Sequence, residues 1–285
     1  MGFRVKTIYD SGTAKFLEDR IVLQPPFFGV LDGVSGLYNP TIGPRLFEGK
    51  SGGQMAVEIV QEVFAHAAVS DELITVVKKA NAMLRKFSES QEIGMDRADL
   101  LPGMMFIFAK IAENEVEIIQ GGDCYAVWEK INGEIGATPN QNFLDEEEKI
   151  RKFNNIIKKY RGNLEKSWAE YMPLSAKLRI ERVNKNSQKR LVILNGQPEA
   201  ENSWYKIILS QRELRTLLLF TDGMIEFDES RNIGEMSKTV IGAYHRQCLA
   251  GMLSRIREIE SQRTSATYIK YAEATALSIE LVNSN

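Results

Sequence analysis

Two apolar segments of this sequence each end in an Asp-Gly pair. Residues 27–33 read Phe-Phe-Gly-Val-Leu-Asp-Gly, and residues 217–223 read Leu-Leu-Leu-Phe-Thr-Asp-Gly. Either pair alone is explained most simply as a turn, because Asp-Gly is common turn chemistry. A carboxylate at the end of a buried strand is nevertheless held rigidly, and a glycine after it lets a backbone carbonyl or a water approach closely. Together the pairs are candidates for a site that binds a hard cation such as Mg²⁺ or Mn²⁺, which prefers oxygen ligands.

Two adjacent acidic residues, Glu18 and Asp19, precede another short apolar segment. By itself such a pair is typical of a solvated surface, and Asp123, which follows two glycines, is by itself typical of a turn. Together with Asp32 and Asp222, Glu18-Asp19 could complete a centre of two metal ions. A dinuclear centre of this kind activates a water and stabilises an in-line displacement at phosphorus.

The elements that position these side chains are predicted by hydrophobic periodicity. Apolar residues at helical spacing predict helices over residues 54–67, 73–87, 144–160 and 249–259, the second with Asp71 as its N-cap. Short apolar or alternating segments predict strands at residues 3–9, 21–23, 27–31, 104–111, 116–120, 124–128, 191–194, 204–209, 217–220 and 275–282. Residues 37–52 and 161–190 are predicted to be connecting segments, and a lid or a recognition surface is the other interpretation of each.

The order of these elements predicts the fold class. Helices come in blocks and strands pair as hairpins, with Asn132-Gly133 as the strongest hairpin dipeptide. This pattern favours an α+β fold over a doubly wound parallel sheet. Two stacked antiparallel sheets flanked by helices are the expected packing. No repeat or linker interrupts the sequence, so we expect one domain over residues 1–285.

Composition narrows the functional classes. The chain has 285 residues with 36 basic and 38 acidic side chains, a net charge of −2, and this balance favours neither a nucleic-acid partner nor a membrane surface. We find no signal-peptide pattern and no apolar run long enough to span a membrane. Cys124 and Cys248 make neither a disulfide framework nor a metal-ligand spacing. A cytoplasmic location is the resulting expectation.

Five segments, in order, resemble the motifs of the metal-dependent protein phosphatases of type 2C. They are Glu18-Asp19-Arg20, Val-Leu-Asp-Gly-Val-Ser-Gly at 30–36, Gly-Gly-Asp-Cys-Tyr at 121–125, Leu-Phe-Thr-Asp-Gly-Met at 219–224 and Ala-Thr-Ala-Leu at 274–277. Each motif is weak alone, but their common order spans the whole chain. The resemblance implies a four-layer αββα sandwich, in which two antiparallel β-sheets are flanked by helices.

The same resemblance implies a role for each acidic residue. Asp32 would bridge two Mn²⁺ or Mg²⁺ ions, the carbonyl of Gly33 would bind one of them, and Asp222 would bind the other. Glu18 would bind directly or through water, with Asp19 beside it. A water between the ions would attack the phosphorus of a phosphoserine or phosphothreonine in a protein substrate, without a phospho-enzyme intermediate.

The chain departs from the family at several positions, two of which concern the predicted metal and phosphate ligands. The family's last metal-binding Asp aligns with Ala272. Glu273 could replace it as a ligand only if the strand entry shifts, because a one-residue shift turns a side chain to the other face. The family's phosphate-holding Arg is replaced by Ala14, next to Lys15, which can attract phosphate only as a point charge.

These departures leave other functions open. The main hypothesis is an active Mn/Mg-dependent phosphatase. The alternative is a catalytically weak or inactive relative that serves as a binding or regulatory module, and a metal-free scaffold outside the family is a third interpretation.

Overall fold

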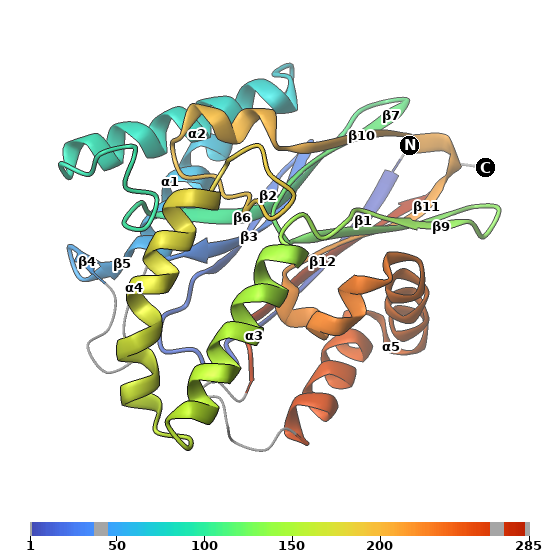
Figure 1. The fold of residues 1–285 in the computed structure, drawn as a ribbon. Helices are drawn as coiled ribbons and strands as arrows, with labels where there is room; N and C mark the ends of the chain where they lie inside the picture. Colours follow the sequence, from blue (N-terminus) through green and yellow to red (C-terminus); the bar gives the residue numbers. More distant parts are fainter. Residues whose placement is uncertain (1, 37–44, 263–270, 283–285) are drawn as a thin grey trace.

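The computed structural model describes residues 2–36, 45–262 and 271–282, and two five-stranded antiparallel sheets form its centre (Figure 1). The first sheet has the order β1 (Gly2–Asp10), β12 (Ala274–Val282), β11 (Leu214–Phe220), β8 (Tyr125–Lys130) and β9 (Ile135–Ala137). The second has the order β10 (Tyr205–Ser210), β7 (Glu115–Gly121), β6 (Gly103–Ile111), β3 (Phe27–Val34) and β2 (Asp19–Gln24). A small hairpin joins β4 (Leu46–Phe47) to β5 (Lys50–Ser51).

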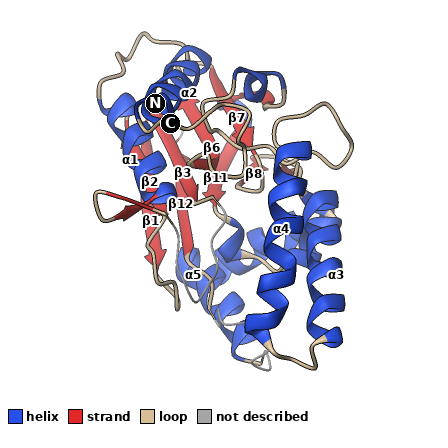
Figure 2. Ribbon diagram, turned by 60° about the vertical axis from the view of Figure 1, so that its left-hand side comes forward, coloured by secondary structure: helices blue, strands red, loops and turns tan. Residues whose placement is uncertain are grey.

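Helices cover the outer faces of both sheets. The helices α1 (Gly52–Ala65) and α2 (Leu73–Ser90) pack on the second sheet, and α5 (Ile233–Ser261) packs on the first. The helices α3 (Phe143–Lys159) and α4 (Leu164–Arg182) lie side by side as a separate hairpin (Figures 1 and 2). The predicted α+β class and the four-layer αββα order are therefore confirmed.

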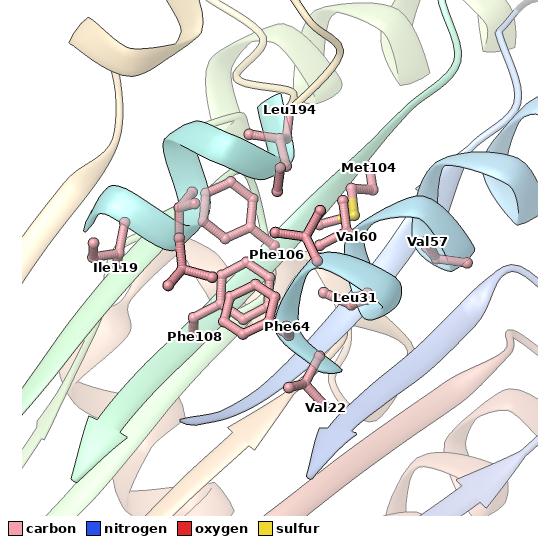
Figure 3. Close-up of a cluster of buried hydrophobic side chains, with 14 of the residues drawn as sticks. Val22, Leu31, Val57, Val60, Phe64, Met104, Phe106, Phe108, Ile119 and Leu194 are labelled. Atoms are coloured by element: carbon pink, nitrogen blue, oxygen red, sulfur yellow. The ribbon is translucent and has the colours of Figure 1, made fainter. Parts of the chain in front are cut away.

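Three apolar layers hold the sandwich together, and the alternation of side chains along β3 connects two of them. Leu31 faces α1 and α2 in the layer shown in Figure 3, where Phe64 stacks on Phe108 with ring centroids 4.3 Å apart. Phe28 and Val30 face the opposite way, into the layer between the two sheets. A third layer lies between the first sheet and α5. Successive strand residues point to opposite faces, so one strand can serve two layers.

The prediction of an irregular segment at residues 161–190 is wrong, because α4 occupies Leu164–Arg182. Its buried face is built from Ser167, Tyr171, Ser175 and Leu178, so small polar side chains hide the usual apolar spacing. Pro173 lies inside the helix, where proline normally disfavours helical structure. Packing against α3, which brings Trp168 to 4.4 Å from the Phe153 ring, compensates for the weak local signal.

Smaller differences concern element boundaries. Helix α5 begins sixteen residues before the predicted 249 and bends at Gln247 and Cys248, whose backbone angles are not helical. The residue that precedes α2 as its N-cap is Glu72, whereas Asp71 accepts a hydrogen bond from the amide of Ala68. Residues 191–194 form only isolated bridges instead of a strand. Of the predicted connection 37–52, residues 37–44 lie outside the described residues. Among the helices that the structure describes, none is long and apolar enough to cross a membrane.

Candidate metal centre

Asp19 and Asp32 lie opposite each other on neighbouring strands. They are Cα partners in the antiparallel register of β2 and β3. The alternation along β3 places Asp32 on the face of Phe28 and Val30, at the end of the layer between the sheets. Asp32-Gly33 is therefore part of a strand and not a turn.

Asp222 enters from the other sheet. It begins a short 3₁₀ turn directly after β11, so here the turn interpretation of Asp-Gly holds. The preceding residue joins the sheets, since the hydroxyl of Thr221 donates a hydrogen bond to Oδ2 of Asp19 at 2.8 Å. The motifs at 18–19 and 221–223 are thus physically connected.

The glycine of each Asp-Gly pair allows close backbone packing. A Cβ added to Gly33 would lie 2.8 Å from the carbonyl carbon of Gly53, and one added to Gly223 would lie 1.9 Å from the carbonyl oxygen of Glu273. Both distances are too short for a side chain. The repeated dipeptide therefore reflects two places where backbones meet beside a carboxylate.

Glu18 is held by hydroxyl groups that the sequence prediction missed. Its Oε1 accepts hydrogen bonds from Ser35 and Ser51. Ser51 also caps α1 by accepting a hydrogen bond from the amide of Gln54 at 3.2 Å. The carboxylate is thus attached to the start of α1 and to the residue that follows β3. Ser35 lies within the motif at 30–36, which is the signal that could have identified it.

The carboxylates at this end of the sandwich repel one another. Burial first, and then the negative charges of the surrounding acids, raise the pKa of Asp32 well above its usual range; those acids are Asp222, Asp19, Asp123 and Glu18. Loss of hydration and the neighbouring charge of Asp123 raise the pKa of Asp222 to about 7. Asp123 is 2% exposed, and its Oδ1 has no hydrogen-bond partner among the described residues.

These carboxylates fit a hard divalent cation, because they supply oxygen donors and their negative charge is opposite to that of the ion. Among the residues that the structure describes, no three acidic, histidine or cysteine side chains converge into a ready-made cage for an ion. Hydroxyl donors hold the carboxylates of Glu18 and Asp19 instead.

A cavity of about 190 Å³ lies beside the cluster, and Ala272, which the resemblance aligns with the family's last metal-binding Asp, is part of its lining. Its lining includes Asp123, Glu146, Asp222, Glu260 and Ala272. The backbone of Ala272 is fixed to α5, because its amide donates to Glu260 at 2.9 Å and its carbonyl accepts from Arg257 at 2.7 Å. Position 272 therefore faces the cavity without offering a carboxylate. Glu146, in the first turn of α3, is not among the predicted site residues.

Glu273 belongs to the opposite side of this segment. Its Oε2 accepts from the amide of Glu18 at 2.8 Å, and its Oε1 accepts from the amide of Asp19 at 3.1 Å and from the hydroxyl of Tyr9 at 2.8 Å. The carboxylate thus binds the backbone of the acidic pair.

Lys15, the predicted phosphate-binding residue, is exposed, and its ammonium lies 5.7 Å from the Phe16 ring centroid. A cation that does act electrostatically on Glu18 is Arg179 of α4, which sequence reasoning missed.

The fold and the arrangement of the strand ends define a class of structure, the sandwich of the type 2C serine/threonine phosphatases. Neither a family model nor a curated protein matches the sequence. Solved structures do match. The serine/threonine phosphatase PstP of Mycobacterium tuberculosis is 17% identical with a TM-score of 0.57, and the alignment covers 99% of both chains.

Two further structures agree. The catalytic domain of PstP in complex with two manganese ions is 16% identical over 99% of both chains, with a TM-score of 0.55. The phosphatase Stp1 of Staphylococcus aureus is 14% identical over 100% of this chain and 96% of its own, with a TM-score of 0.56. The resemblance predicted from the five motifs is thereby confirmed at the level of the fold.

Proposed function

We propose that residues 1–285 form one metal-dependent protein phosphatase domain that hydrolyses phosphoserine or phosphothreonine in a protein substrate, in the cytoplasm. The observation that carries this proposal is the placement of three acids at adjoining strand ends, in a fold shared with serine/threonine phosphatases: Asp19 lies opposite Asp32, and Thr221, which binds Asp19, precedes Asp222. The presence of two manganese ions in the PstP complex supports the same cofactor here.

Two Mn²⁺ or Mg²⁺ ions would be held by Asp32, the carbonyl of Gly33, Asp222 and the pair Glu18-Asp19. When bound, such ions supply a nucleophile at neutral pH and offset charge at the phosphoryl group. The chain's own residues keep the donors in place. Thr221 holds the carboxylate of Asp19, and the serine hydroxyls hold that of Glu18.

The test is hydrolysis of p-nitrophenyl phosphate and of a phosphothreonine peptide by the purified chain with Mn²⁺ or Mg²⁺. We expect turnover of both substrates with metal and none after a chelator is added. Turnover that survives the chelator would exclude the proposed mechanism.

A second candidate function is a binding or regulatory module of low or no activity. The observation that favours it is Ala272, which faces the cavity where the family has its last ligand. Titration calorimetry separates the two functions, because a module that binds Mn²⁺ without any turnover fits only the second.

Glu273→Gln is expected to weaken Mn²⁺ binding without changing the number of ions bound. The side-chain nitrogen of glutamine would face the backbone amide of either Glu18 or Asp19, so at least one hydrogen bond to a charged acceptor is lost, worth about 1.5–3 kcal/mol. The acidic pair would be less well held. Titration calorimetry with Mn²⁺ measures both affinity and stoichiometry.

A direct ligand would behave differently, because its loss would lower the number of ions bound. Tyr9→Phe is the matched milder variant, since it removes one hydrogen bond to Glu273 and leaves the two backbone amides in place. Affinity equal to wild type in Glu273→Gln would show that the anchoring contacts have no effect on the site.

A further inference from the structure

The helix α4 brings a cation to the metal-centre end of the sandwich. Its last turns bury Ser175 and Leu178, and Arg179 lies next to them on the same side. Directly after the helix, Val183 donates its amide to the carbonyl of Arg179 at 2.9 Å. This hydrogen bond ties the backbone of Arg179 to that of Val183.

Val183 packs into a small apolar cluster that includes the strand of the metal centre. The buried members are Ala98, Val183, Leu191 and Ile193, and Val34 and Met105 pack against them. Val34 follows Asp32 by two residues, and Met105 is the Cα partner of Asp32 on β6. Arg179 is thus one helical turn from a cluster built on both sides of the central carboxylate.

The acids around Arg179 already have other partners. Asp145 is bound by Arg182 at 3.0 Å, and Asp99 is bound by Arg97 at 2.8 Å. Glu18 accepts from two serine hydroxyls. All three acids act electrostatically on Arg179.

The guanidinium itself makes no hydrogen bond and no ion pair with the residues that the structure describes, although it is only partly exposed. Loss of hydration lowers its pKa below the ordinary arginine value. Because buried charges are normally paired, an uncommitted guanidinium at this place is unusual.

We propose that Arg179 binds the phosphate of the substrate. Its planar fork can donate two parallel hydrogen bonds to a phosphoryl group, which a lysine cannot match. It supplies from α4 the cation that the sequence lacks at Ala14. This inference rests on the proposed phosphatase function, and it assigns the phosphate contact to a helix outside the five motifs.

Inorganic phosphate tests the contact directly, as the product of the reaction. Calorimetry on the Mn²⁺-loaded protein is expected to show phosphate affinity lowered roughly ten- to hundredfold in Arg179→Gln, with Mn²⁺ affinity unchanged. Arg179→Lys keeps the charge and loses the fork, so we expect a smaller loss. With phosphopeptide, Arg179→Lys should raise KM more than it lowers kcat. Lys177→Gln, on the exposed side of α4, is the matched control and should equal wild type.

Unchanged phosphate affinity in both Arg179 variants would overturn the inference. So would a loss in Lys15→Gln with none in Arg179→Gln. If Arg179→Gln fails to fold, as shown by circular dichroism, the Lys variant decides the question. If the wild-type protein binds phosphate through Arg179 without hydrolysing any phosphoester, the inference stands while the proposed catalytic function fails.

Discussion

Asp32→Asn is expected to lower Mn²⁺-dependent phosphatase activity by roughly a thousandfold or more, equivalent to about 4 kcal/mol of transition-state stabilisation. Asp32 is the carboxylate on which the charges of four other acids act, and it lies opposite Asp19 in the strand register. Asparagine keeps the size of the side chain and removes the charge that would hold the ions. The measurement is kcat/KM for a phosphothreonine peptide with saturating Mn²⁺.

The same variant provides its own folding control. In the metal-free protein, Asp32→Asn removes one of several mutually repelling charges, so its melting temperature should be equal to or above that of wild type. Added Mn²⁺ should raise the melting temperature of wild type, because a ligand that binds only the folded state stabilises it by about 2.7 kcal/mol at 100 times Kd. Full activity of Asp32→Asn would show that Asp32 is not part of the metal centre.

Gly223→Ala is expected to destabilise the fold by about 1–3 kcal/mol and to lower activity by about a hundredfold. The added Cβ would lie 1.9 Å from the carbonyl oxygen of Glu273, so the backbone at 222–223 or at 273 has to move. Either shift disturbs Asp222 or the anchor on Glu18 and Asp19. Denaturant unfolding gives the stability, and the peptide assay gives the activity.

Gly242→Ala is the matched glycine control. Gly242 lies within α5, where an added Cβ would meet nothing closer than the guanidinium of Arg246 at 3.8 Å. Alanine favours a helix over glycine by about 0.5–1 kcal/mol, so this variant should be slightly more stable and equally active. Equal stability losses in the two variants would show that the contact at Gly223 is not the cause.

Local patterns in the sequence were sufficient to predict most of the framework. Alternation and apolar runs predicted the strands that became β3, β6, β7 and β11, because side-chain direction in a strand repeats every two residues. Asp32 and Asp222, at the ends of the β3 and β11 runs, could be recognised from the same runs. Helix α4 could not be predicted, since its buried face consists largely of serine and tyrosine and it contains Pro173.

Glu273 shows what the two-residue repeat of side-chain direction can and cannot predict. Glu273 was predicted as a ligand only if the strand entry shifts, because a one-residue step normally turns a side chain to the other face. The structure places Ala272 in the cavity with Asp222, and Glu273 on the amides of Glu18 and Asp19. The direction of the side chain was thus a local property, whereas its hydrogen-bond partners were not.

Local patterns in the sequence indicate which carboxylates lie at strand ends, that a glycine follows two of them, and that the sheets are antiparallel. The side chains that surround these carboxylates are set by tertiary contacts. Ser51 binds Glu18 from the start of α1, Glu146 lines the cavity from the first turn of α3, and the charge of Arg179 on α4 acts on Glu18. Their places depend on the order of strands in each sheet and on how the α3–α4 hairpin packs. Strand order and hairpin packing depend on contacts between residues far apart in the chain, which the local spacing of residues does not predict.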